Sequence, residues 1–161
     1  MSRAPAFERK VCARGGLAAR LNGLARPLVF TNGVFDVLHR GHVTYLARAR
    51  ALGGSLVVGV NSDASVKRLG KGDDRPVNAL ADRMAVLAAL ESVSVVTPFD
   101  EDTPLALILA CRPDVLVKGG DWKPAAIVGA REVQGWGGAV HSIPFEHERS
   151  TTALLARIRG G

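Results

Sequence analysis

The chain has 161 residues, of which 47% are hydrophobic and 22% charged, and this composition is typical of a single globular domain with its own core. No apolar run approaches the ~18 residues that a membrane-spanning helix needs, and the N-terminus lacks the apolar core of an export signal. We therefore expect a cytoplasmic protein without a membrane partner. The formal net charge of +6 is scattered and only 5% of the residues are aromatic, which favours a small anionic substrate over nucleic acid.

Short apolar runs rich in valine alternate along the chain with helix-like stretches. This alternation indicates crossover units, a parallel sheet and helices on both faces. The sequence thus predicts a single-domain α/β fold, a Rossmann-like doubly wound parallel sheet of about five strands. Residues 1–14 show little pattern and are expected to form an N-terminal arm before a domain of residues 15–161. The expected strands are 28–31, 56–60, 93–97, 115–117 and 139–143, and the expected helices are 43–52, 79–90, 104–111, 125–136 and 151–158.

Glycine and proline mark the ends of two expected helices. Gly53-Gly54 is expected to end the helix 43–52, since glycine tolerates the left-handed position that follows a helix. Arg112-Pro113 is expected to end the helix 104–111, because the residue before a proline is pushed out of the helical region.

Polar clusters stand at the expected carboxyl ends of three strands and before the last helix. In an open parallel sheet the ligand site lies outside the carboxyl ends of the strands. We therefore expect these clusters to converge on one site. They are residues 31–42 (TNGVFDVLHRGH), Asn61-Ser62-Asp63, Lys118-Gly119-Gly120-Asp121 and Ser150-Thr151-Thr152.

The first cluster contains two histidines, His39 and His42, with Gly41 between them. Gly41 lets a ligand approach the backbone closely, and the helix that begins there offers free N–H groups to a phosphate. The Ser-Thr-Thr cluster resembles a second helix start with hydroxyls and amides, and Lys71 and Lys118 are candidates to add positive charge. The chain contains neither a Walker P-loop nor GxGxxG. The pattern predicts an oligophosphate site of another kind.

Plainer interpretations stay open for single residues. The histidine spacing also suits zinc, although no cysteine or carboxylate set completes a ligand shell, and we expect no metal site. Either histidine alone suits a structural cap, and both Asp63 and the Ser-Thr-Thr turn suit a helix N-cap. The basic stretch 67–75 suits a solvated surface loop.

Several motifs together resemble a known family. Asp36-x-x-His39-x-Gly41-His42 after a strand resembles the HxGH signature of the nucleotidyltransferase superfamily, whose members transfer a nucleoside monophosphate to a phosphate and release pyrophosphate. The resemblance to D-glycero-β-D-manno-heptose 1-phosphate adenylyltransferases is more specific and covers about residues 28–158. It is carried, in chain order, by TNGVFDVLHRGHVTYLARARALG, VGVNSDASVKRL, RPVN, DRMAVLAALESV, EDTPLALI, PDVLVKGGDW and STT.

This resemblance implies an enzyme that transfers AMP from ATP to heptose 1-phosphate, with Mg²⁺ on the triphosphate, and makes ADP-heptose for the lipopolysaccharide core. It also implies a homo-oligomer and, because this chain has no room for the kinase to which many similar enzymes are fused, a separate heptose 7-phosphate kinase. Catalysis is assigned to His39, His42 and Lys71. Asp36 is expected to bind the acceptor's hydroxyls or to orient a histidine. Asn61 and Asp63 are also expected to bind the acceptor, and the expected nucleotide contacts are Thr31, Asn32, Gly33, Phe35, Gly41, Lys118, Gly119, Ser150, Thr151 and Thr152.

Two other activities stay open. Glycerol 3-phosphate cytidylyltransferases have an arginine five residues before the serine of the STT motif, whereas this chain has Phe145 there and Arg149 directly before Ser150. That difference favours ATP over CTP. A non-catalytic nucleotide or RNA-binding protein is the third alternative. In any of the catalytic readings, residues 69–78, rich in glycine and charge, are expected to close over the triphosphate as a lid.

Overall fold

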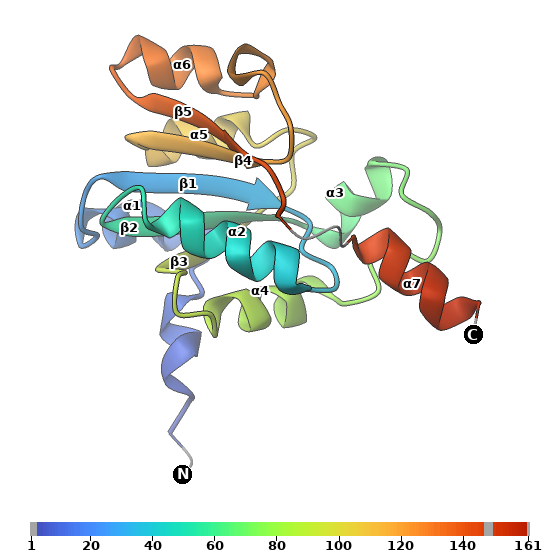
Figure 1. Cartoon of the computed structure of the whole chain (residues 1–161). Helices are drawn as coiled ribbons and strands as arrows, with labels where there is room; N and C mark the ends of the chain where they lie inside the picture. The colour runs from blue at the N-terminus through green and yellow to red at the C-terminus, as the bar shows by residue number, and fades with distance from the viewer. Residues whose placement is uncertain (1–2, 147–149, 161) are drawn as a thin grey trace.

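The computed structural model describes residues 3–146 and 150–160. Five parallel strands form one sheet in the order β3-β2-β1-β4-β5, with helices on both faces (Figure 1). The doubly wound parallel sheet predicted from the sequence is therefore confirmed. The strands are β1 (Leu28–Gly33), β2 (Ser55–Asn61), β3 (Val95–Phe99), β4 (Val115–Gly119) and β5 (Ala139–Ile143).

Two hydrophobic cores fill the space between the sheet and its helices. Successive side chains of a strand point to opposite faces, so Val29 enters one core and Phe30 the other. The first core is covered by α2 (Arg40–Arg50) and α4 (Leu80–Ala88), and the second by α1 (Leu17–Asn22), α5 (Leu105–Cys111) and α6 (Ala130–Gly135). Figure 1 shows α3 (Asp63–Arg68) and α7 (Thr151–Arg159) beyond the carboxyl ends of the strands. Three 3-10 helices are Ala6–Lys10, Arg14–Gly16 and Pro124–Ala126.

One predicted helix boundary is wrong and one helix was not expected, each for an identifiable reason. The expected helix 125–136 is interrupted at Gly129, whose φ of 85° lies in the left-handed region, and α6 begins only at Ala130. A Cβ at Gly129 would also lie 2.8 Å from the side chain of Ile108. The helix α3 was not predicted, because its six residues are too few to show a helical period.

Gly53 and Gly54 do not end α2 through a left-handed turn. The helix ends at Arg50, and neither glycine has a positive φ. They are required for space instead, because a Cβ at Gly53 would lie 2.4 Å from the carbonyl oxygen of Pro27 and one at Gly54 would lie 2.8 Å from that of Arg26. This close approach lets the Gly54 N–H donate to the Pro27 carbonyl at 2.8 Å and brings the chain into β2 beside β1.

The segment before residue 15 is attached to the rest of the protein. The Cys12 N–H donates to the carbonyl of Val96 at 2.9 Å, and the Lys10 ammonium donates to the carbonyl of Leu90 at 2.9 Å. A boundary between an arm of residues 1–14 and a domain of residues 15–161 stays a prediction. Within residues 3–146 and 150–160, no helix is long and apolar enough to span a bilayer.

The strands β1 and β4 separate at the centre of the sheet. Their pairing ends at Phe30 and Leu116, although both strands continue beyond these residues. Tyr45 of α2 is inserted at this point, where its hydroxyl bonds with that of Thr31 and donates to the carbonyl of Val117 at 3.5 Å. Because the strand order reverses between β1 and β4, this opening is the switch point at which open α/β sheets bind ligands.

Candidate active site

A cavity of about 320 Å³ lies at this switch point, below the start of α7. Three of the four polar clusters expected to converge contribute to its wall, and the Asn61-Ser62-Asp63 cluster does not. The lining residues are Asn32, Gly33, Val34, Phe35, Asp36, His39, His42, Tyr45, Lys71, Arg75, Lys118, Gly119, Phe145, Ser150, Thr151 and Thr152.

The two histidines stand at the start of α2, with His39 as the N-cap and His42 in the first turn. Their rings stack with centroids 3.8 Å apart and 24° between planes, and the rings of Phe35 and Phe145 meet His42 edge-on. Burial, with smaller contributions from the nearby His39 and Lys71, lowers the pKa of His42 to about 4. The ring is therefore neutral at pH 7. In the described part of the chain, Nδ1 of His42 is buried without a hydrogen-bond partner.

Positive side chains also line the cavity, among them Lys71, Arg75 and Lys118. Burial and the neighbouring Lys71 lower the pKa of Lys118. Burial and Arg75 lower the pKa of Lys71, and Asp36 offsets part of that effect. Buried lysines whose pKa values are lowered further by neighbouring positive charges indicate a site that an anionic ligand completes.

The carboxylate of Asp36 holds a neighbouring loop in place. Its side chain is 0% exposed and accepts hydrogen bonds from Nε of Arg75 at 2.6 Å, from the Val77 N–H at 2.9 Å and from the Asn78 N–H at 2.8 Å. Burial alone would raise the pKa of Asp36, but these donors outweigh it and hold the pKa below its ordinary value. Asp36 therefore anchors residues 75–78, and its predicted contact with the acceptor's hydroxyls or with a histidine stays a prediction.

Asn61 and Asp63 likewise support the site from outside its lining. They are joined by Arg83, which is 1% exposed and donates to the Asn61 carbonyl at 2.8 Å and to Oδ1 of Asp63 at 2.7 Å. The same guanidinium donates to the carbonyls of Val34 and Asn78. Arg83 was missed from the sequence, because an arginine in a helical pattern usually faces solvent. It ties the ends of β1 and β2 to α4, and the predicted acceptor contacts of Asn61 and Asp63 stay a prediction.

Backbone conformation shapes the end of β1. Phe35 has a φ of 49°, a left-handed conformation that is uncommon outside glycine and persists where the surroundings enforce it. Gly33 makes room for it, since a Cβ there would lie 2.9 Å from the Phe35 ring. Thr31 is buried against Tyr45, and Gly41 is buried in the first turn of α2, so both lie behind the cavity wall.

The start of α7 is the second helix end at the cavity. Ser150 is its N-cap and accepts a hydrogen bond from the Ala153 N–H at 3.0 Å. The Thr151 hydroxyl donates to the carbonyl of Val37 at 2.9 Å, which fastens α7 to the loop after β1. The start of α7, the positive end of its dipole, therefore lines the same cavity as the histidine pair. Arg149, which directly precedes this helix, lies outside the described residues.

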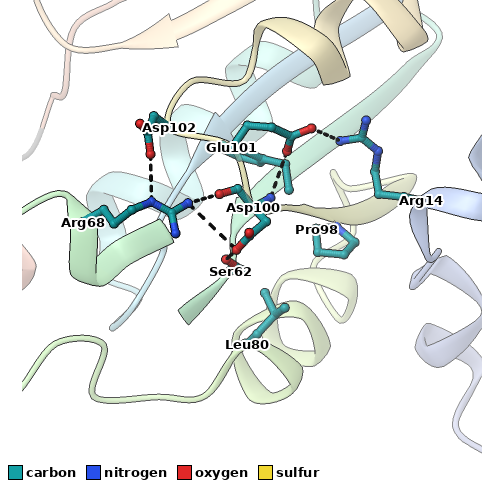
Figure 2. A pocket seen from close by; sticks show the side chains of 9 residues that line it. Arg14, Ser62, Arg68, Leu80, Pro98, Asp100, Glu101 and Asp102 are labelled. Carbon is teal, nitrogen blue, oxygen red and sulfur yellow. Dashed lines mark hydrogen bonds and ion pairs between the residues drawn. The ribbon is translucent and has the colours of Figure 1, made fainter. Parts of the chain in front are cut away.

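A larger cavity of about 910 Å³ lies at the carboxyl end of β3 (Figure 2). Its charged side chains pair with one another, Arg68 with Asp100 and Asp102, and Arg14 with Glu101. Neither histidine of the pair reaches it. Because these charges are already compensated, the cavity between β1 and β4 is the candidate active site.

Comparisons with known proteins identify the chain as a nucleotidyltransferase. It belongs to the cytidylyltransferase-like family, which matches residues 30–155. It is 57% identical over 157 residues to the D-beta-D-heptose 1-phosphate adenylyltransferase of Bordetella bronchiseptica, covering 96% of this chain and 97% of that protein. It is also 57% identical over 143 residues to the bifunctional protein HldE of Cronobacter sakazakii, covering 89% of this chain and 30% of that protein.

Solved structures show the same architecture. The lipopolysaccharide core biosynthesis protein from Thermoplasma volcanium is similar with a TM-score of 0.61 and 27% identity, over 79% of this chain and 100% of that one. Pantoate-beta-alanine ligase from Francisella tularensis has a TM-score of 0.57 and 14% identity, over 88% of this chain and 68% of that one. At that identity the second likeness concerns the fold alone.

Proposed function

We propose that the protein transfers AMP from ATP to D-glycero-β-D-manno-heptose 1-phosphate, giving ADP-heptose and pyrophosphate for lipopolysaccharide core biosynthesis. The observation that carries the proposal is the stacked pair of His39 and His42 at the start of α2, facing two lysines in one cavity. The 57% identity to the B. bronchiseptica adenylyltransferase supports both the nucleotide and the acceptor.

The acceptor supplies its own nucleophile in this reaction. A phosphate monoester has a second pKa near 6 and is mostly dianionic at neutral pH, so no general base is required. A sugar-phosphate oxygen bonds to the α-phosphorus while the bond from that phosphorus to the β-bridging oxygen breaks. Pyrophosphate leaves with that oxygen and both electrons of the bond. The protein has to align the two phosphates and stabilise the charge that spreads over them.

The side chains of the cavity divide this work. His42 donates a hydrogen bond to the α-phosphate, together with the free amides at the start of α2. His39, Lys71 and Lys118 bind the remaining phosphate oxygens, and the Ser150 end of α7 offers a second set of amides. Mg²⁺ accompanies ATP as part of the substrate and is held by phosphate oxygens and water, since the Asp36 carboxylate is already engaged.

Further parts of the proposal concern the setting of the enzyme. It acts in the cytoplasm as a homo-oligomer, and a heptose 7-phosphate kinase acts in the same pathway. The relatives in C. sakazakii and Yersinia pestis are bifunctional by name, which supports a second linked activity. The main alternative is transfer of CMP to glycerol 3-phosphate. Phe145 disfavours it, because cytidylyltransferases of that type have an arginine at this place in the motif.

A pyrophosphate-release screen tests the proposal. ATP and CTP are each combined with heptose 1-phosphate and with glycerol 3-phosphate, with Mg²⁺ present and the His42→Ala protein as the control. We expect rapid release from ATP with heptose 1-phosphate and little from the control. Release only from CTP with glycerol 3-phosphate would support the alternative, and no release from any pair would refute the enzymatic reading.

A further inference from the structure

A second, smaller cavity of about 70 Å³ opens on the other side of Asn32 and Lys118. These two residues line both cavities and form the wall between them. The remaining surface of the smaller cavity comes from the loop after β4 and from the start of α5, and includes Trp122, Pro104 and Ile127. The candidate active site is therefore separated from the smaller, largely apolar cavity only by the polar side chains of Asn32 and Lys118.

Trp122 is a large apolar side chain that is 46% exposed. Its backbone N–H donates to the Ser142 hydroxyl at 3.0 Å, and the Lys118 ammonium lies 5.5 Å from the centroid of its ring. Gly120 has a φ of 113°, and a Cβ there would lie 3.1 Å from Nε1 of Trp122. Among the residues that the structure describes, none accepts a hydrogen bond from the indole N–H. The loop after β4 thus offers a ligand the face of the Trp122 indole and its N–H donor, both beside the Lys118 ammonium.

We propose that Trp122, together with Lys118 and Asn32, forms the binding site for the sugar ring of the acceptor. This inference rests on the proposed function. Lys118 borders both cavities, so its ammonium binds the acceptor's phosphate where that phosphate meets the α-phosphorus of ATP. The sugar ring then extends from the phosphate into the smaller cavity. Its C–H groups pack on the indole face, and its hydroxyls accept from the indole N–H and bond with the Asn32 amide.

The nucleotide base is a poorer occupant of this recess. The larger cavity already has an aromatic ring for the base, because Phe145 is 43% exposed and lies beside Gly119, where a Cβ would lie 2.9 Å from the ring. That ring lies with its centroid 6.3 Å from the centroid of the His42 ring, next to the proposed phosphates. Phe145 is purely apolar and suits the face of a base. The indole N–H and the Lys118 ammonium are donors that suit sugar hydroxyls and a phosphate.

Steady-state kinetics of Trp122 variants test the assignment after turnover of the unchanged protein with ATP and heptose 1-phosphate has been established. We expect Trp122→Ala to raise KM for heptose 1-phosphate by roughly tenfold or more, with KM for ATP within about twofold. Trp122→Tyr keeps an aromatic face and a donor and should recover most of the loss. Trp136→Phe is the matched control, since Trp136 donates to the Pro113 carbonyl away from the cavity.

Fluorescence provides a readout that does not depend on turnover. The chain has two tryptophans, so the Trp136→Phe protein reports on Trp122 alone. Heptose 1-phosphate without ATP should change its emission, and inorganic phosphate at equal concentration should change it far less. The inference is overturned if phosphate alone gives the full change, or if Trp122→Ala raises KM for ATP in place of KM for the sugar phosphate. Absence of turnover in the unchanged protein would instead count against the proposed function.

Discussion

Asp36 is the side chain whose removal should disturb the frame of the active site most. Its carboxylate is fully buried and accepts three hydrogen bonds, one of them from Arg75, which is itself only 6% exposed. Asp36→Asn keeps the shape of the side chain but removes its charge and replaces one acceptor oxygen by an NH₂ donor. That donor then faces another donor, and Arg75 remains as a buried cation without a counter-charge.

The expected loss follows from the burial of the pair. Breaking a buried ion pair by removing one partner costs about 3–5 kcal/mol in the free energy of unfolding. Because about 1 kcal/mol shifts Tm by roughly 2–4 °C in a domain of this size, Tm should fall by roughly 6–20 °C. Urea and thermal unfolding of the purified protein measure both quantities. Adding Arg75→Met should recover part of the loss, since it removes the unpaired cation.

The pair of Arg68 and Asp102 provides the matched control. Its N–O distance is 2.8 Å, but the two side chains are 45% and 79% exposed. Asp102→Asn should therefore cost less than about 1 kcal/mol. If Asp36→Asn costs no more than Asp102→Asn, the reasoning that Asp36 anchors the loop through a buried pair is refuted.

Three further results are expected. His42→Ala should lower kcat by roughly 10²-fold or more with little change in folding, and activity within twofold in the folded variant would remove His42 from the mechanism. Because the pKa of His42 falls from 6.5 to about 4 on folding, the unfolded chain takes up this proton first as the pH drops. The free energy of unfolding should therefore be highest above pH 6.5 and fall by on the order of 3 kcal/mol towards pH 4. His42→Gln should flatten this dependence of the unfolding free energy on pH. An unchanged slope in that variant would contradict the pKa shift. Since Asp36 holds residues 75–78, the proposed lid reduces to residues 69–74, and trypsin cleavage after Lys71 should slow with ATP and Mg²⁺, whereas an unchanged rate would count against a lid.

The fold was predictable because its strands carry a strong local signal. All seven residues of β2 are buried, and a strand covered on both faces is a continuous apolar run in the sequence. Short or strained elements lack such a signal. The helix α3 has six residues, and the break before α6 depends on a left-handed Gly129 that packs against Ile108.

The site was predictable where topology alone brings residues together. His42 comes after β1 and Lys118 lies at the carboxyl end of the neighbouring parallel strand β4, and both line the cavity. The role of Asp36 was not predictable, because it depends on backbone donors that reach it from residues 77 and 78 only in the folded chain. Tyr45 was missed for a similar reason, since an aromatic residue on the buried face of a helix resembles ordinary core in the sequence.

Direct competition between nucleotides tests the central claim most closely. The protein is given heptose 1-phosphate with equal concentrations of ATP and CTP, and the nucleotide sugars are quantified by mass spectrometry at low conversion. Their ratio equals the ratio of the two kcat/KM values. We predict ADP-heptose in at least about tenfold excess over CDP-heptose, because a site that pairs with the adenine edge leaves buried polar groups unpaired when cytosine enters. Equal amounts of the two products, or an excess of CDP-heptose, would contradict the assignment as an adenylyltransferase.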